Sequence, residues 1–246
     1  MRCLKFLLIA AVVALTACGP NESQKQKLAE KKRIECLDQF CEGDIEPKRD
    51  VATETALKLH GQWYIAPKRY YSTGKNGGGF YWPSRHPMFE DGDYPEGGQD
   101  FPEKAIEIFL TGRQRWGDPN ALTPWEGAGW EGRFAELQQQ GLRIERQQLR
   151  PELERIRFFD SQGLKYRHEY FLATLQRRVR GNGPPGIACD SQTDTNPKAR
   201  PGCSGGMYWQ EDVYADFRFH AQHAADWPAI HQEVVRVLSL AKKVNP

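Results

Sequence analysis

Short runs that alternate apolar residues with polar or charged ones recur along this chain, and they constrain its fold more than any other feature. The clearest runs are residues 57–65, 105–111, 142–149, 153–159 and 165–174. Alternation with a period of two is typical of a β-strand that buries one face, and proline or glycine bounds several of these runs. Asp160–Gly163 supplies turn residues between two of them, so residues 153–174 predict a β-hairpin.

A second hairpin is predicted nearer the C-terminus, from residues 206–210 and 213–219. Successive side chains of a strand point to opposite faces, so alternate positions share a face. One face of the second strand is entirely apolar: Val213, Ala215, Phe217 and Phe219. We expect this face to lie in the core.

The end of the chain has a helical period instead. Apolar residues fall on one stripe, formed by Trp227, Ile230, Val234, Val237 and Ala241. Asp226 is expected to cap this helix and Pro228 to lie in its first turn, while Lys242 and Lys243 are expected in its last turn. The predicted fold class is therefore α+β, with antiparallel sheet and a C-terminal amphipathic helix packed on it.

The N-terminus has the pattern of an export signal. Arg2 and Lys5 precede an apolar run, Phe6–Leu15, that is too short to span a bilayer. The following residues, Leu15-Thr16-Ala17-Cys18, resemble the bacterial lipobox. That resemblance implies cleavage before Cys18 and lipid on its sulfur, and Gly19 favours sorting to the outer membrane. The alternative is an ordinary secretory signal that ends near a cysteine.

Three segments follow from this interpretation. Residues 1–17 are the signal peptide that is removed, and residues 18–33 are polar and predict a lipidated, flexible tether. Residues 34–246 are long enough for one core and predict a single α+β domain. Within it, residues 72–102 are rich in glycine, proline and aromatic residues, which indicates a functional loop or an irregular covering element.

The charge balance argues against nucleic acid as a partner. Two of the 34 basic residues, Arg2 and Lys5, leave with the signal peptide, so 32 basic residues face 32 acidic ones. Proteins that bind nucleic acid normally carry a basic excess, because neutralising phosphates supplies much of their affinity. A location in the cell envelope, facing the periplasm, leads to the same expectation.

Four cysteines remain once Cys3 is removed and Cys18 takes lipid: Cys36, Cys41, Cys189 and Cys203. An even number outside the cytoplasm favours two disulfides, and proximity in sequence favours pairing Cys36 with Cys41 and Cys189 with Cys203. Free buried thiols and a zinc site are the alternatives. The zinc site is disfavoured because no Cys-x-x-Cys spacing occurs.

Two motifs resemble catalytic or cofactor patterns on paper. Gly181–Gly186 reads G-x-G-x-x-G, but Pro184 and Pro185 lack the backbone N–H groups that a dinucleotide loop needs. Gly202–Gly206 reads G-x-S-x-G, which would make Ser204 a nucleophile. That motif requires a strand-to-helix turn, whereas the residues after Ser204 have a strand pattern.

Histidines gather near the C-terminus at His220, His223 and His231, with Asp216 and Asp226 nearby. A metal site would require three or four of these side chains to converge. The position of His231 beside the apolar stripe favours a structural role instead. The sequence thus predicts no metal, no cofactor and no catalytic residue, so we expect a binding protein rather than an enzyme.

Several segments resemble the periplasmic immunity lipoproteins that protect against lipase effectors of type VI secretion. The resemblance rests on Cys203 and the hairpin it introduces, and on residues 212–219, 223–230, 64–71 and 81–84. It implies a partner, a secreted antibacterial lipase or phospholipase, and it implies contact with the membrane through the lipid on Cys18. The alternatives are an envelope assembly or conjugation lipoprotein and a hydrolase that uses Ser204.

Five aromatic residues are the candidate contacts with that partner: Tyr70, Tyr71, Phe80, Tyr81 and Trp82. Tyrosine and tryptophan dominate the binding energy of many interfaces. The alternative for these residues is that they fill or cover the core.

Overall fold

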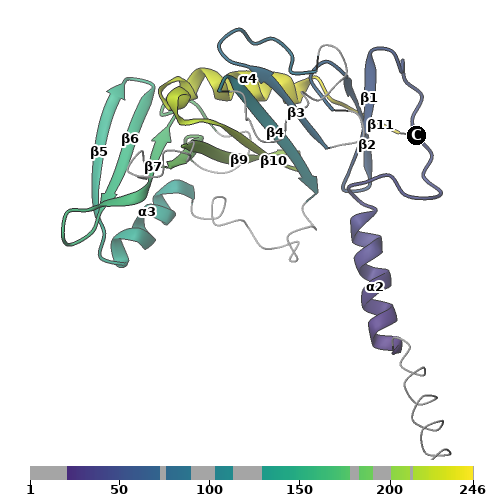
Figure 1. Cartoon of the computed structure of the whole chain (residues 1–246), viewed down its shortest axis with the longest axis horizontal. Coiled ribbons are helices and arrows are strands. Elements are labelled where there is room, and N and C mark those ends of the chain that lie inside the picture. Colours follow the sequence, from purple (N-terminus) through teal and green to yellow (C-terminus); the bar gives the residue numbers. More distant parts are fainter. Residues whose placement is uncertain are drawn as a thin grey trace, which may run out of the picture. The chain divides into compact units, whose positions relative to one another are not determined.

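A computed structural model describes residues 21–72, 76–89, 103–112, 129–177, 183–190, 201–210 and 213–245. The chain divides into two compact units, residues 1–36 and residues 37–246 (Figure 1). Cys18 lies outside the described residues, so its lipidation stays a prediction. Within the described residues, none of the helices combines the length and the apolar character needed to cross a membrane.

The described part of the first unit is a helix, α2 (Glu22–Glu35), where the sequence predicted a flexible tether. The Asn21 side chain accepts a hydrogen bond from the backbone of Gln24, whose side chain accepts one from the backbone of Asn21. This capping box satisfies donors at the start of the helix. Glutamate, glutamine and lysine also favour helix, so a segment that buries no residue is still helical.

An antiparallel sheet of eight strands dominates the second unit, in the order β3-β4-β10-β9-β8-β7-β6-β5. Its strands are β3 (Gly77–Tyr81), β4 (Ala105–Gly112), β5 (Arg143–Arg150), β6 (Leu153–Phe159), β7 (Lys165–Leu172), β8 (Gly186–Asp190), β9 (Gly202–Gln210) and β10 (Val213–His220). The two predicted hairpins are confirmed as the antiparallel pairs β6–β7 and β9–β10. The fold class is α+β, as predicted.

A smaller sheet of three strands has the order β1-β2-β11, formed by β1 (Glu54–Leu59), β2 (Gln62–Pro67) and β11 (Lys242–Val244). The single strand predicted over residues 57–65 was wrong, because His60 and Gly61 both have positive φ and turn the chain back. The carboxylate of Asp38 joins the two sheets. It accepts hydrogen bonds from the backbone N–H of His60 at 2.8 Å and of Gly112 at 2.9 Å.

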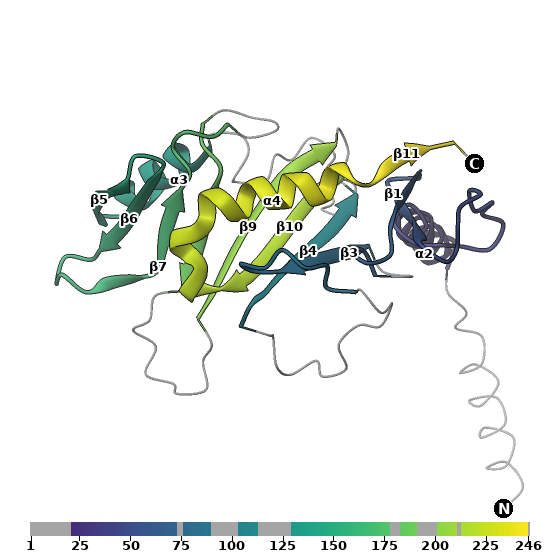
Figure 2. The ribbon, with the colours of Figure 1, turned by 90° about the horizontal axis from the view of Figure 1, so that it is seen from above.

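Helix α4 (Trp227–Ser239) packs on one face of the large sheet, across β9 and β10 (Figure 2). The predicted apolar face of β10 is buried, and so is the predicted stripe of the helix. The Trp227 ring is fully buried and stacks on Phe217 and Phe219, with ring centroids 5.1 Å and 6.2 Å apart. The apolar face of β10 and the apolar stripe of α4 therefore pack against each other in one core.

Both ends of this helix differ from the prediction. Asp226 precedes the helix, but it makes no cap hydrogen bond and instead accepts one from the indole N–H of Trp82, at 3.0 Å. The helix ends at Ser239, and Lys242 and Lys243 lie in β11 rather than in a last helical turn. Pairing of this short strand with β2 replaces the expected helical hydrogen bonds.

A second helix, α3 (Gly129–Gln139), covers the opposite face of the sheet over β6 and β7 (Figure 1). Its buried side chains Trp130, Phe134 and Leu137 pack on residues of those strands, including Phe158 and Tyr170. Their spacing at i, i+4 and i+7 is the sequence signal that indicates this helix. In the described part of the chain, α4 and α3 thus lie on opposite faces of the large sheet, and the polar side of β10 faces away from α4.

Candidate functional site

The face of the large sheet opposite α4 carries the candidate site. A cavity of about 570 Å³ lies over β7 to β10 beside α3, and a smaller one of about 240 Å³ adjoins it. Both are lined by Ala188 of β8, Ser204 of β9 and Arg218 of β10, so they form one continuous hollow. We call this surface the sheet hollow.

Small residues create the hollow. Ala188 and Ser204 are cross-strand partners on its floor, and Gly202 and Gly206 continue the floor along β9. A Cβ at Gly206 would lie 2.2 Å from the hydroxyl oxygen of Tyr214, so only glycine lets that ring cross the strand. Because these side chains are smaller than their neighbours, they leave a depression in the surface of the sheet.

Two positive side chains border the hollow. The Arg218 guanidinium lies over the ring of Phe109, 5.6 Å from its centroid, and no ion pair to Arg218 occurs in the part of the chain that the structure describes. Arg133 of α3 pairs with Glu136 at 2.9 Å. Arg218 is therefore an exposed cation that an aromatic face, rather than a carboxylate, holds in position.

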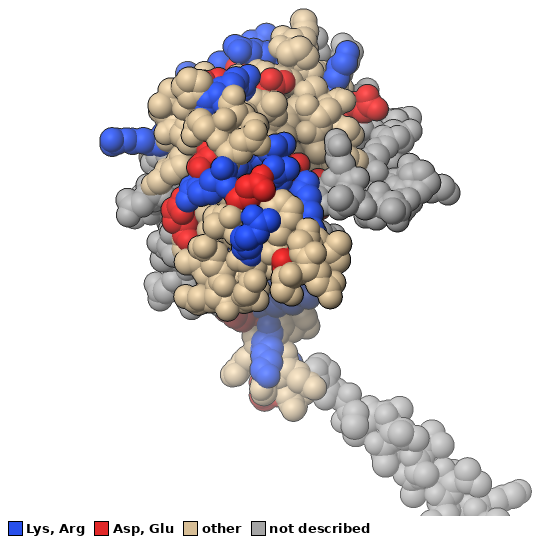
Figure 3. All heavy atoms as spheres, turned by 90° about the vertical axis from the view of Figure 1, so that its left-hand side faces the viewer, with Lys and Arg blue, Asp and Glu red and all other residues tan. Residues whose placement is uncertain are grey.

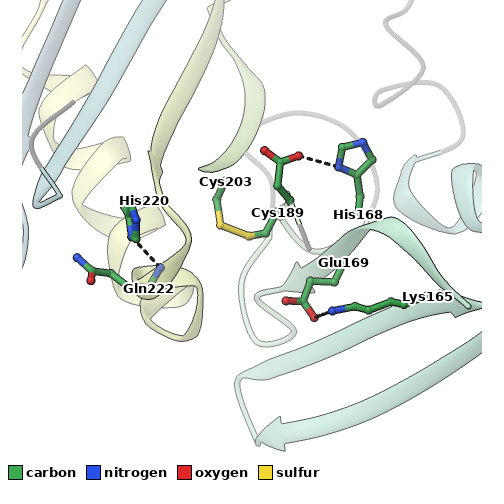
Figure 4. Close-up of a disulfide and its surroundings, with 8 residues drawn as sticks. Lys165, His168, Glu169, Cys189, Cys203, His220 and Gln222 are labelled. Atoms are coloured by element: carbon green, nitrogen blue, oxygen red, sulfur yellow. Dashed lines mark hydrogen bonds and ion pairs between the residues drawn. A yellow bond between two sulfur atoms is a disulfide. The ribbon is translucent and has the colours of Figure 1, made fainter. Parts of the chain in front are cut away.

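The Cys189–Cys203 disulfide lies next to the floor of the hollow, and Cys203 is one of the lining residues. His168 and His220 lie on either side of it, and His168 pairs with Asp190 across β7 and β8 at 3.3 Å (Figure 4). The disulfide joins β8 to β9, which among the described residues are paired at two positions, Ala188 with Ser204 and Cys189 with Cys203. The bond therefore reinforces the strand pair that has the fewest paired residues in the described part of the large sheet.

Both predicted disulfide positions are confirmed. Cys189 pairs with Cys203, and Cys36 and Cys41 are also disulfide-bonded. The location in an oxidising compartment stays a prediction.

Asp216 lies two residues before Arg218 on the same side of β10, and it is half-buried. No hydrogen bond or ion pair to its carboxylate occurs among the described residues. Burial raises the pKa of Asp216 to about 6, and the positive charge of Arg218 lowers it only in part. Near pH 7 the Asp216 carboxylate is thus mostly ionised, although its burial disfavours the charged form.

Replacing Asp216 by asparagine should stabilise the fold at pH 7.5 and not at pH 4. Between the ordinary pKa of 3.8 and the value of about 6, the folded chain keeps a proton that the unfolded chain has lost. Stability contributed by this group therefore falls as the pH rises through that window. We expect D216N to raise the free energy of unfolding by ~2 kcal/mol at pH 7.5, from urea unfolding.

A loss of stability at pH 7.5 would contradict this interpretation of Asp216. The difference between wild type and variant is the informative quantity, because burial also lowers the pKa of His231 from 6.5 to about 4. Stability contributed by that group rises with pH over an overlapping window. D190N is the matched control and should give no gain, since Asp190 pairs with His168.

The G-x-S-x-G motif does not form a nucleophile elbow. Ser204 lies within β9, with strand on both sides of it, and its side chain is exposed and makes no hydrogen bond to a described residue. A nucleophile elbow needs a sharp turn between a strand and a helix. The G-x-G-x-x-G motif likewise leads directly into a strand, β8, and not into a helix.

The three candidate metal-binding histidines have separate contacts. His220 accepts a hydrogen bond from the backbone of Gln222 at 3.2 Å, and His223 lies 3.0 Å from the carbonyl of Glu103. His231 is buried in α4 and contacts the Gln176 side chain at 2.5 Å. Among the described residues, no three histidine, cysteine or acidic side chains lie together as a metal site would require.

The proposed aromatic contacts belong mainly to the core. Tyr70, Tyr71, Phe80 and Trp82 are buried, and only Tyr81 is half-buried. The hydroxyl of Tyr71, for example, donates to the carbonyl of Val237 in α4 at 2.8 Å. These four side chains cannot serve as exposed interface residues in this structure, so that prediction is corrected.

Glycines explain how these aromatics reach the core. A Cβ at Gly78 would lie 2.7 Å from the Tyr70 carbonyl, and one at Gly79 would lie 2.6 Å from the Ile106 carbonyl. The stretch predicted to be a loop therefore contains a strand, β3, whose glycines allow close approach of the backbone.

The side of the molecule at β5 and β6 carries basic and acidic side chains that are interleaved (Figure 3). Its charges pair with one another. Arg146 binds Glu131 at 2.7 Å and Glu154 at 2.8 Å, and Arg157 binds Glu145. Internal pairing makes this edge a weaker candidate site than the sheet hollow.

Comparison of the chain with protein-family models, with curated proteins and with solved structures finds no match.

Proposed function

We propose that this chain is a lipid-anchored protein of the cell envelope that binds and neutralises an antibacterial lipase delivered by type VI secretion. In this proposal the sheet hollow is the contact surface. The observation that supports it best is that Arg218 and Asp216 both border the hollow without an ion-pair partner among the described residues. A partner that supplies complementary charge and hydrogen bonds would satisfy both side chains.

The arrangement of the hollow supports binding rather than catalysis. Ser204 is its natural nucleophile, but a nucleophilic serine needs an adjacent base held by a third group. The paired histidine, His168, lies two strands away on β7, and strands are spaced about 4.8 Å apart. His168 also lies two residues along β7 from Tyr170, the position in register with Ser204 through Ala188. Ser204 and the His168–Asp190 pair are thus poorly placed to act together. His220 lines the same cavity from the neighbouring strand β10, but its Nδ1 accepts from the backbone of Gln222 and no carboxylate pairs with it among the described residues.

The predicted anchor supports the choice of partner. Lipid on Cys18 would hold the protein at a membrane, which is where a lipase acts. Helix α2 has 14 residues and adds about 21 Å to the chain between the anchor and residue 37.

Deleting the gene should make cells sensitive to siblings that carry the secretion system. Cells without the protein, cells complemented with it and the parent are each mixed with attacking siblings, and survivors are counted. We expect a marked loss of survivors for the deletion alone, and none when the attacker lacks its secretion apparatus. Equal survival of deletion and parent under attack would reject the immunity function.

A further inference from the structure

We propose that the sheet hollow also binds a small anionic amphiphile, a molecule with one carboxylate or sulfonate group on a compact apolar body. This goes beyond the proposed function, because it concerns a small molecule and holds whatever protein the chain binds. The site lies between α3 and β10, with Arg218 as the residue that would receive the anion.

Arg218 is suited to this role because its guanidinium is exposed and has no carboxylate partner among the described residues. Contact with Phe109 limits the positions of its side chain, so less freedom is lost when an anion binds. Its cross-strand partner Ser204 supplies a hydroxyl beside it. A guanidinium and a hydroxyl on one surface are common donors to a carboxylate or sulfonate.

The rest of the cavity suits an apolar body. Tyr166 and Tyr170 stand on β7, Ala188 lies on the floor, and the disulfide half Cys203 and the ring of Phe219 also line it. A volume of about 570 Å³ is in the range of sites for small ligands, which are mostly apolar with a few polar groups that fix orientation.

The carboxylates of the hollow do not cancel this attraction. Asp190 pairs with His168 at 3.3 Å, away from Arg218 along β8. Asp216 lines the smaller adjoining cavity and not the larger one. Arg218 lines both cavities, and the charge of Asp216 interacts with it without forming an ion pair. In the larger cavity Arg218 is therefore the group that would receive an anion.

Two fluorescent probes with the same apolar body test the proposal: 8-anilinonaphthalene-1-sulfonate and the uncharged N-phenyl-1-naphthylamine. Each is titrated into the folded mature protein. We expect saturable binding of the sulfonate to one site, and we expect Arg218→Gln to weaken it roughly tenfold, since a charge-assisted hydrogen bond is lost. Binding of the uncharged probe should not change.

Arg143→Gln is the matched control, because Arg143 is also an exposed strand arginine over an aromatic ring, 4.9 Å from the Phe159 centroid, and lies outside the hollow. It should leave binding of the sulfonate unchanged. Absence of saturable binding by the wild type would overturn the proposal. So would equal affinities of wild type and R218Q, or equal losses in R218Q and R143Q. Circular dichroism confirms that each variant is folded.

Discussion

Replacing Trp227 by alanine should lower the free energy of unfolding of the mature chain by about 4 kcal/mol, the largest effect that we expect from one substitution. Trp227 is fully buried, and its ring stacks on Phe217 and Phe219 of β10. Its indole N–H also donates to the carbonyl of Pro185 at 3.1 Å. The variant would lose the packing and leave that carbonyl without its donor.

Urea unfolding followed by circular dichroism measures this loss. Trp227→Phe should be milder, at about 1.5 kcal/mol, because it keeps an aromatic ring but loses the hydrogen bond. Leu175→Ala is the surface control, since that side chain is 73% exposed, and it should change stability by less than about 0.5 kcal/mol. A loss in W227A no larger than in L175A would show that α4 does not hold the core together.

Replacing Cys189 and Cys203 together by alanine should lower the free energy of unfolding by about 3 kcal/mol. The disulfide closes a loop between residues 14 apart in sequence, and a loop of that length restricts the unfolded chain to about this extent. The bond also joins β8 and β9 where two residue pairs of the described chain connect them. Because Ala188 and Ser204 are the other pair there, we expect the double variant to bind the sulfonate probe more weakly.

Urea unfolding with and without reductant measures the effect. Reduced wild type should approach the stability of the double variant, and the variant should respond less to reductant than the wild type does. An unchanged unfolding midpoint in the double variant would contradict this role of the disulfide. If the double variant keeps its stability but binds the sulfonate probe differently, the disulfide affects the hollow and not the stability of the fold.

The sequence predicted those strands and helices whose apolar residues recur at one regular spacing. On β10 the apolar residues from Val213 to Phe219 predicted the buried face, and the stripe from Trp227 to Ala241 predicted the helix that covers it. Patterns of this kind report directly on burial. The lipid anchor and the secreted partner remain predictions.

What the sequence did not predict depends on contacts between distant residues. Gly78 was expected in a loop or an irregular covering element, whereas it lies in β3, where the Tyr70 carbonyl approaches its Cα atom closely. Trp82 reads as a candidate contact residue, but it is buried and donates to Asp226, 144 residues away. The sheet hollow joins β7 to β10 with α3, so no local pattern could indicate it.

Three variants in the competition assay decide most directly whether the sheet hollow binds a partner or catalyses a reaction. Ser204→Ala removes only a hydroxyl, Ser204→Trp fills the hollow, and Arg143→Trp places the same ring on an exposed strand outside it. All three substitutions are at exposed positions, so the fold should tolerate them. We predict that S204W survives attack as poorly as the deletion, while S204A and R143W survive like the parent. Full protection by S204W would show that the partner binds elsewhere. Loss of protection in S204A would show that the Ser204 hydroxyl is itself required, as catalysis by Ser204 would demand and occupation of the hollow by a partner would not.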